Sequence, residues 1–212
     1  MSLSKIKYKD FNKSQIDFCN LLDDPIKMFN EWFSMALDID EENAICFVLS
    51  TVSSDFTPSS RVVLLKQFDE QGFIFFTNYN SAKSRDIDEN QMVAANFFWH
   101  GLEKQVRVVG RAEKISEEES DRYFNSRSRE SQLGAWLSYQ SKTINFEDSL
   151  SDLLQEVDSR FKDIEVPRPS HWGGYRIIPE MMEFWQGKPY RLHDRLVFHL
   201  DGDVWKKERL SP

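Results

Sequence analysis

The chain has 212 residues, 40% of them hydrophobic and including 17 Phe and 6 Trp, which is enough apolar material for one sizeable core. Its 27 Lys and Arg face 35 Asp and Glu, and the formal net charge of −8 opposes general attraction to nucleic acid or to an anionic membrane. Any cationic cluster must therefore act locally, which indicates a small anionic ligand.

Residues 1–22 are polar and weakly patterned. We predict that they form a flexible arm that orders only against a ligand or a partner subunit, followed by a single domain over residues 23–212. The arm carries Lys5, Lys7 and Lys9 where a secretory signal needs an apolar stretch.

The cysteines and the apolar runs indicate the compartment. Cys19 and Cys46 have neither a CxxC nor a metal-type spacing, which favours the reducing cytoplasm. The longest apolar run, residues 44–49, is far shorter than the roughly 20 residues needed to span a bilayer. We therefore expect a cytoplasmic protein.

The first half of the chain opens with a helix and continues in strands. Asp24 and Pro25 form an N-cap and a first-turn proline, and apolar residues then recur at helical spacing. β-Branched and aromatic runs follow and predict an antiparallel sheet with a hairpin turn at residues 69–72. The expected strands cover residues 44–52, 61–68, 73–78, 92–99 and 105–115.

The middle of the chain is predicted to be helical, with a capping box at Ser116 and Glu119. Helices are expected at residues 82–89, from about residue 117, and at about 146–161. Strands are expected again at residues 172–178, 181–186, 191–200 and 204–209, the last two joined by a hairpin at Asp201-Gly202. Nine strands with few polar edges favour closure, so we predict an α+β fold with a closed or nearly closed antiparallel barrel.

Near the C-terminus, Arg191, His193 and Arg195 occupy alternate positions, which on an extended strand lie on one face. Cationic groups about 6 to 7 Å apart repel one another and lose hydration unless an anion covers them. The row therefore indicates a flat or phosphorylated anion as ligand. The alternative is a solvated edge strand whose arginines are neutralised by Asp194 and nearby acids.

Two further segments carry cations at strand ends. Arg61 and Lys66 face opposite sides of a regular strand, which predicts two separate anionic groups unless a bulge rotates one side chain. The turn from Thr77 to Lys83 follows a strand and opens a helix, where backbone N–H groups and the lysine can hold a phosphate. The alternatives are side chains that extend into water and an ordinary turn capped by Ser81.

Tyr123, Arg127 and Ser131 follow one another at intervals of four. On a helix the phenol, the guanidinium and the hydroxyl could converge on one phosphate, and a helix break at Ser126 or Ser128 need not separate them. The alternative is a solvated helix face whose arginines pair with local glutamates.

Neutral donors and an aromatic side chain complete the candidate set. Gln105, Gln140 and Ser141 suit the edge of a heteroaromatic ring, and Trp185 can lie against such a ring or pack in a core. The histidines have no metal-ligand spacing, so no metal is assigned. The sequence contains no GxGxxG, GxxxxGK[ST], HExxH or GxSxG motif.

Several longer motifs occur together and in order: RVVLLK (61–66), FFTN (75–78), LEKQVRVVGRAE (102–113), SRESQLGAW (128–136), HWGGYR (171–176) and FWQGKPYRLHDRL (184–196). With them, the chain from about Asp24 to Pro212 resembles the pyridoxine/pyridoxamine 5′-phosphate oxidase family. The resemblance implies an FMN-binding split barrel that works as a homodimer with FMN in clefts between the subunits. It also implies oxidation of pyridoxine or pyridoxamine 5′-phosphate by O₂ to pyridoxal 5′-phosphate and hydrogen peroxide, with ammonia released from the amine.

The same resemblance implies a role for each motif residue. Arg191 and His193 would lie over the reacting carbon, Arg191 to orient the substrate and His193 to handle the proton. The substrate phosphate would be held by Lys66, Tyr123, Arg127 and Ser131. FMN would be contacted by Arg61, Val62, Leu64, Leu65, Lys66, Phe76, Thr77, Lys83, Gln105, Gln140, Ser141, Trp185 and Arg195.

The chain departs from the family pattern in three places. Phe76 replaces a frequent tyrosine, which matters little if the contact there is through the backbone. Ala82 stands where a basic residue is frequent, so one phosphate contact is missing or comes from Lys83 or Arg85. In the N-terminal arm, Lys5 and Tyr8 are the nearest match to an Arg-x-x-Tyr, and no Gly-Leu follows. One alternative function is therefore a non-catalytic binder of flavin or pyridoxal phosphate on the same barrel. Analogy between barrels alone suggests another, a flavin reductase fed by a nicotinamide cofactor.

Overall fold

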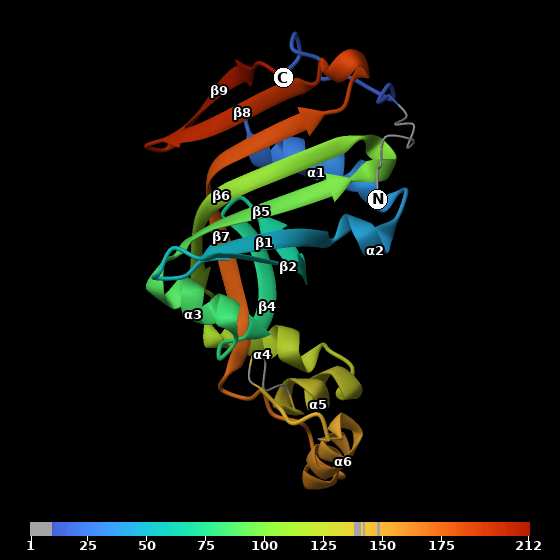
Figure 1. Cartoon of the computed structure of the whole chain (residues 1–212), viewed down its shortest axis with the longest axis vertical. Helices are drawn as coiled ribbons and strands as arrows, with labels where there is room; N and C mark the ends of the chain where they lie inside the picture. The colour runs from blue at the N-terminus through green and yellow to red at the C-terminus, as the bar shows by residue number, and fades with distance from the viewer. Residues whose placement is uncertain (1–9, 138–140, 142, 148) are drawn as a thin grey trace.

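The centre of the molecule is a curled antiparallel sheet, seen in a computed structural model that describes residues 10–137, 141, 143–147 and 149–212. The strands follow the order β2-β1-β5-β6-β7-β4-β3, and β8 and β9 extend the sheet from the far half of β7 (Figure 1). This confirms the predicted α+β class with an antiparallel split barrel. The strands are β1 (Cys46–Val52), β2 (Pro58–Leu64), β3 (Gln67–Asp69), β4 (Gly72–Asn78), β5 (Met92–Trp99), β6 (Lys104–Lys114), β7 (Trp172–Gln186), β8 (Asp194–Asp201) and β9 (Val204–Leu210).

Strand β7 is continuous, so the predicted break into residues 172–178 and 181–186 is wrong. Pro179 lies opposite Gly110 at a register shift in the β6–β7 ladder, and such a bulge accommodates a residue that lacks an N–H donor. The first half of β7 pairs with β4 and the second half with β8. This one strand therefore connects the two ends of the molecule (Figure 1).

The predicted strand over residues 61–68 is instead divided between β2 and β3. The N–H of Leu65 donates to the carbonyl of Ile45, and the N–H of Lys66 donates to the carbonyl of Ile74. The chain thus changes neighbours from β1 to β4 within two residues. Gly72, with φ of +132°, then closes the predicted β3–β4 hairpin.

Helices α1 and α4 begin where the local capping signals predict, whereas α6 begins at Leu150, behind a cap at Ser149, and not at about residue 146. Asp24 accepts hydrogen bonds from two N–H groups of the first turn of α1, and Ser116 accepts one from Glu119 at the start of α4. No helix in the described part of the chain is long and apolar enough to cross a membrane. The helices are α1 (Pro25–Leu37), α2 (Glu41–Ala44), α3 (Ala82–Glu89), α4 (Glu117–Asn125), α5 (Arg129–Leu137) and α6 (Leu150–Arg160), with 3₁₀ turns η1 (His100–Leu102) and η2 (Pro189–Arg191).

Two aromatic cores hold these elements together. Helix α1 packs on the sheet through Phe29, whose ring meets those of Phe73 and Phe97 edge-on at centroid distances of 4.8 and 5.1 Å. A smaller core gathers Phe124 and Trp172 beneath the helices α4–α6, which lie at the start of β7 (Figure 1). The second core fixes the segment between α4 and α5, which forms part of the candidate site.

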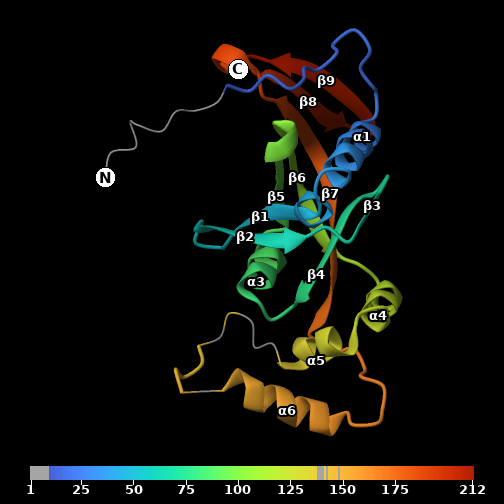
Figure 2. The ribbon, with the colours of Figure 1, turned by 90° about the vertical axis from the view of Figure 1, so that its right-hand side faces the viewer.

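The N-terminal segment, residues 10–22, packs on the chain's own barrel, beside β8 and β9 (Figure 2). The N–H groups of Asn12 and Lys13 donate to the carboxylate of Glu103, and the N–H of Ile16 donates to Asp194. We expected ordering only against a ligand or a partner, but buried carboxylates of the same chain provide the acceptors. Residues 1–9 lie outside the described residues.

Candidate active site

A cavity of about 610 Å³, called here the cationic pocket, opens between β2, β4, α3 and the α4–α5 segment. Four Lys and Arg side chains line it, and no Asp or Glu is among the described residues of its wall. Such a wall on a chain of net charge −8 favours an anionic ligand. The wall consists of Arg61, Val62, Val63, Leu64, Lys66, Phe76, Thr77, Lys83, Tyr123, Arg127, Ser128, Ser131, Ser141 and Trp172.

Arg61 and Lys66 both face this pocket. The expectation that they serve opposite sides of a strand is wrong, because β2 ends at Leu64 and the chain turns before Lys66. Val62 and Leu64 also line the wall, whereas Leu65 is buried in the core.

The Arg61 guanidinium is oriented by side chains on β1, β2 and α3. Its Nη1 donates to Thr51 Oγ1 at 2.8 Å, its Nη2 donates to Ser59 Oγ at 2.7 Å, and Asp86 lies 3.9 Å away. Burial lowers the pKa of Arg61, and the charge of Asp86 partly offsets this. The side chain is therefore oriented in advance and only partly neutralised.

Lys83 adds a second half-buried cation at the start of α3. Its Nζ donates to Thr77 Oγ1 at 2.9 Å and to Ser81 Oγ at 3.1 Å. Burial lowers the pKa of Lys83 to about 8, and repulsion from Arg61 acts in the same direction. Ser81 makes no side-chain cap on α3, so the alternative of an ordinary capped turn does not apply here.

Ser141 reaches the same helix from a distant part of the chain. Its Oγ accepts a hydrogen bond from the N–H of Ala82 at 3.0 Å, so this hydroxyl occupies the N-terminus of α3. Lys83 and Arg85 were the two candidates to replace the basic residue that is frequent at position 82. Lys83 lines the pocket, whereas Arg85 is exposed and donates to the carbonyl of Asn80. Gln140 lies outside the described residues.

Tyr123, Arg127 and Ser131 converge on the pocket although the helix breaks between them. Helix α4 ends at Asn125 and α5 begins at Arg129, and all three residues still line one wall. The break therefore changes the path without separating the three groups.

The guanidinium of Arg127 contains a donor that no group in the described part of the chain satisfies. Its Nη1 is buried and has no hydrogen-bond partner among the described residues, while its charged centre lies 4.6 Å from the ring centroid of Trp172. Burial lowers the pKa of Arg127, and Tyr123 partly offsets this. Since buried donors are almost always paired, the unpaired nitrogen in a cationic pocket indicates an acceptor that comes with the ligand.

A row of stacked rings supports this wall. Phe76 stacks on Tyr123 with centroids 3.9 Å apart and on Trp172 with centroids 5.3 Å apart. Trp172 thus supports both the phenol and the guanidinium. Sequence reasoning did not identify Trp172 as a candidate site residue, although this residue lies in the motif HWGGYR.

Gln105, Trp185 and Arg195 form a second group at the other end of β7. They are direct register partners on β6, β7 and β8, so their side chains share one face of the sheet. Trp172, in the cationic pocket, is the first residue of β7, and Trp185 lies 13 positions later. At about 3.3 Å per residue, roughly 40 Å of strand separates the two groups.

Glu183 anchors the second group. Its carboxylate accepts from Arg195 Nε at 2.7 Å and from Arg107 Nη1 at 2.9 Å, and its side chain is 5% exposed. Sequence reasoning missed this residue. The signal was available, because an acid two positions before Trp185 on a strand faces the same side as Trp185 and its partner Arg195.

Arg191 and His193 do not share a strand face with Arg195, so the predicted alternation is wrong. Strand β8 begins only at Asp194, and Tyr190 and Arg191 have φ of 58° and 61°, a left-handed backbone that a strand cannot contain. Arg191 is exposed. His193 nevertheless lies against the second group, with its ring centroid 4.6 Å from that of Trp185.

The imidazole of His193 has one nitrogen engaged. Its Nδ1 accepts a hydrogen bond from the N–H of Lys188 at 3.1 Å. Burial lowers the pKa of His193, and the nearby charge of Arg191 acts in the same direction. Both effects favour the neutral imidazole.

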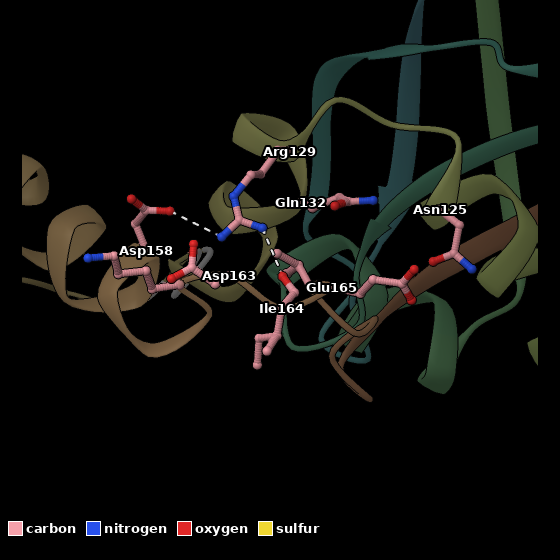
Figure 3. Close-up of a pocket in the computed structure, with 9 residues that line it drawn as sticks. Asn125, Arg129, Gln132, Asp158, Asp163, Ile164 and Glu165 are labelled. Atoms are coloured by element: carbon pink, nitrogen blue, oxygen red, sulfur yellow. Dashed lines mark hydrogen bonds and ion pairs between the residues drawn. The ribbon is translucent and has the colours of Figure 1, made fainter.

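Another hollow, of about 800 Å³, lies beside α5 and α6 and has a different character (Figure 3). Its wall mixes Arg129 and Lys162 with three carboxylates. Arg129 is already engaged by Asp158 and by the carbonyl of Ile164 (Figure 3). No cluster of three or more His, Cys, Asp or Glu that could hold a metal ion occurs among the described residues.

The chain matches two family models over most of its length. Residues 40–159 match the model described as pyridoxamine 5′-phosphate oxidase. Residues 172–212 match the model described as the pyridoxine 5′-phosphate oxidase C-terminal dimerisation region.

Individual relatives agree with these matches. A protein of Trichormus variabilis named pyridoxine/pyridoxamine 5′-phosphate oxidase is 48% identical over 207 residues, which cover 96% of each chain. The crystal structure of PhzG from Burkholderia lata, in complex with tetrahydrophenazine-1-carboxylic acid, is 28% identical, covers 95% of this chain and 100% of its own, and has a TM-score of 0.87. A structure from Nostoc punctiforme, described as a pyridoxamine 5′-phosphate oxidase-related, FMN binding protein, shares the fold with a TM-score of 0.72 and 16% identity, covering 87% and 97%. The chain therefore belongs to the pyridoxamine 5′-phosphate oxidase family.

Proposed function

We propose that the chain is an FMN-dependent oxidase that converts pyridoxine 5′-phosphate or pyridoxamine 5′-phosphate to pyridoxal 5′-phosphate. O₂ is reduced to hydrogen peroxide, and the amine substrate also releases ammonia. The observation that carries the proposal is the buried, unpaired Nη1 of Arg127 in a pocket whose described wall has four cations and no carboxylate. That wall suits phosphate monoesters.

The donors of the pocket suit two anions. Arg61, Lys83 and Ser141 gather around the start of α3, with Thr77 bonded to the lysine, and we assign this part to the phosphate of FMN. Lys66, Tyr123, Arg127 and Ser131 lie toward the α4–α5 break, and we assign them to the substrate phosphate. The partial desolvation of Arg61, Lys83 and Arg127 strengthens this fit, because a bound phosphate would compensate cations that burial alone disfavours.

FMN would supply the acceptor for the hydride that leaves the C4′ carbon of the substrate. The residues of the chain bind and orient the reactants for this step. The phosphate-binding residues hold one end of the substrate, so the reacting carbon is restricted to a small volume at the other end. The guanidinium of Arg191 carries several N–H donors and suits the orientation of the C4′ oxygen or nitrogen, while neutral His193 can hold or donate a proton there.

The assigned FMN contacts require a homodimer. Arg61 and Lys83 lie near one end of β7, and Trp185 and Arg195 lie at its other end, so one subunit does not gather them around one flavin. Apolar side chains on the outer sheet face, including Val62 at 65% and Phe98 at 48% exposure, offer a surface for a second copy. The match of residues 172–212 to a dimerisation region supports this arrangement.

The likeness to PhzG favours a second candidate, a flavin oxidase that acts on a tricyclic carboxylic acid. Identity to the pyridoxine/pyridoxamine 5′-phosphate oxidase relative is higher, at 48% against 28%. The cradle of Lys66, Tyr123, Arg127 and Ser131 also suits the three oxygens of a phosphate better than one carboxylate. We therefore rank the phosphorylated vitamer first.

The test is product formation by the purified, FMN-loaded protein. With pyridoxine 5′-phosphate and O₂, we expect pyridoxal 5′-phosphate and hydrogen peroxide in equal amounts, and with unphosphorylated pyridoxine we expect little turnover. Bound flavin without product from either phosphorylated vitamer would instead favour a non-catalytic binder. Turnover of a tetrahydrophenazine carboxylic acid alone would favour the second candidate.

A further inference from the structure

Phe11 packs against the ring of Trp185, in the second group, and against the neighbouring ring of His193. Its ring centroid lies 5.6 Å from that of Trp185, with the planes at 90°, and 5.9 Å from that of His193. A Cβ on Gly187 would approach Phe11 Cγ to 2.6 Å, so the ring occupies space that glycine leaves free. The imidazole of His193 therefore has the ring of Phe11 and the ring of Trp185 as neighbours.

The segment that carries Phe11, residues 10–16, is anchored to the barrel by two buried carboxylates and a buried amide. Glu103 Oε2 accepts from the N–H groups of Asn12 and Lys13 at 2.7 and 2.9 Å, and Ser14 Oγ donates to Gln186 Oε1 at 2.6 Å. Asp194 Oδ2 accepts from the N–H of Ile16 at 3.2 Å. Glu103 and Asp194 are 5% and 2% exposed, so these charge-assisted bonds are protected from water and fix the segment.

The opposite side of the imidazole is held by the backbone. A backbone N–H can only donate, so Nδ1 of His193 is the acceptor of the bond from Lys188, and the proton of the neutral ring lies on Nε2. The charge of Arg191 acts on the ring, and the side chains of Lys188 and Asp194, on either side of this segment, pair with each other at 3.3 Å. Moving the proton to Nδ1 would break the bond to Lys188.

We infer that Phe11 is a positioning residue, which clamps His193 against Trp185 so that the imidazole presents Nε2–H, as a donor and not as a base, to the bound substrate. The inference rests on the proposed function for the identity of that substrate. It assigns His193 the role of orienting the C4′ oxygen or nitrogen by a hydrogen bond. It also explains why an aromatic residue stands in the N-terminal segment, directly before the backbone groups that Glu103 binds.

The test compares Phe11→Ala and Phe11→Leu with Phe18→Ala as the matched control. Phe18 belongs to the same N-terminal segment, but its ring lies under the guanidinium of Arg209, 3.9 Å from the charged centre. The first readout is ¹⁵N NMR of His193 in the flavin-free protein, which does not depend on any activity. We expect a neutral Nε2–H tautomer in the unmodified protein and in Phe18→Ala. In Phe11→Ala we expect a mixed tautomer and a higher His193 pKa, because water reaches the ring, with Phe11→Leu between the two.

The second readout is the split between kcat and KM in the FMN-loaded enzyme. We expect Phe11→Ala to lower kcat about 10- to 100-fold with little change in KM, because the phosphate-binding residues are intact and only the reacting end loses its orientation. An unchanged tautomer and pKa of His193 in folded Phe11→Ala would overturn the inference. A rise in kcat would also overturn it, because the ring would then obstruct the site. If no variant and no unmodified protein turns over the vitamer, the NMR result still decides the role of Phe11 while the proposed function fails.

Discussion

The substitution Arg127→Met separates ligand binding from stability. Methionine keeps much of the length and the apolar packing against Trp172 but removes the charge and the donors. In the ligand-free protein the buried Nη1 of Arg127 is unpaired, and a buried unsatisfied donor costs about 1 to 3 kcal/mol. We therefore expect the free energy of unfolding to stay the same or to rise by up to that amount.

The same substitution should weaken substrate binding strongly. Hydrogen bonds to a charged group contribute about 1.5 to 3 kcal/mol, and each 1.4 kcal/mol corresponds to a factor of ten. The KM for pyridoxine 5′-phosphate should therefore rise about 10- to 150-fold, measured by peroxide formation. FMN affinity, measured by quenching of flavin fluorescence, should change little, because the flavin phosphate is assigned to Arg61 and Lys83.

The matched control is Arg129→Met, two residues along the chain. Arg129 donates to the carbonyls of Ile164 and Phe161 and does not line the cationic pocket. The Arg129→Met protein should have a lower free energy of unfolding and an unchanged KM. This is the reverse of the result expected for Arg127→Met. An Arg127→Met protein that is destabilised and has an unchanged KM would refute the assignment of this guanidinium to the substrate phosphate.

Three further predictions concern the flavin. Arg61→Ala should release FMN, seen as loss of the visible flavin spectrum after gel filtration, and full occupancy would remove Arg61 from the cofactor site. Because the pKa of Lys83 is about 8 in the ligand-free protein, FMN affinity should fall as the pH rises through 8. Lys83→Arg should abolish that fall, since arginine stays charged. The same pH dependence of FMN affinity in both proteins would contradict this. Glu183→Gln should weaken FMN binding and lower the melting temperature, because Arg195 and Arg107 lose the carboxylate that holds them. The control Glu180→Gln alters an exposed pair with Arg111 and should change neither quantity. Equal behaviour of the two variants would contradict an anchoring role for Glu183.

Local signals in the sequence predicted the elements whose causes are local. The caps at Asp24 and Ser116, the hairpins at residues 69–72 and 201–202, and the helix break after Asn125 all follow from a few neighbouring residues. An α+β fold with a nearly closed antiparallel barrel was also predicted, because strand count and the need to satisfy edges constrain the architecture. The split form of the barrel was expected only from the motif resemblance.

The errors arose where the decisive contacts are distant in sequence. A strand was expected to end at residue 178, but the pairing of Pro179 with Gly110 across a bulge keeps β7 continuous. The left-handed backbone at Arg191 prevents residues 191–193 from joining strand β8, and no residue pattern signals this conformation. The turn at Lys66 likewise depends on a change of partner strand.

The candidate site residues were assigned one by one only through the motif resemblance. Spacing alone could not bring together Arg61, Lys83, Arg127 and Ser141, because they lie on separate elements that only the topology of the barrel collects into one pocket. Glu183 and Phe11 act through neighbours on other strands and segments, so the motifs did not identify them.

The most direct test of the central claim is anaerobic mixing of the FMN-loaded protein with pyridoxine 5′-phosphate. We predict that the visible flavin absorbance bleaches, that one pyridoxal 5′-phosphate forms per flavin, and that admission of O₂ restores the colour with release of hydrogen peroxide. A flavin that stays oxidised with the phosphorylated vitamer, or that bleaches only with a nicotinamide cofactor, would contradict the account.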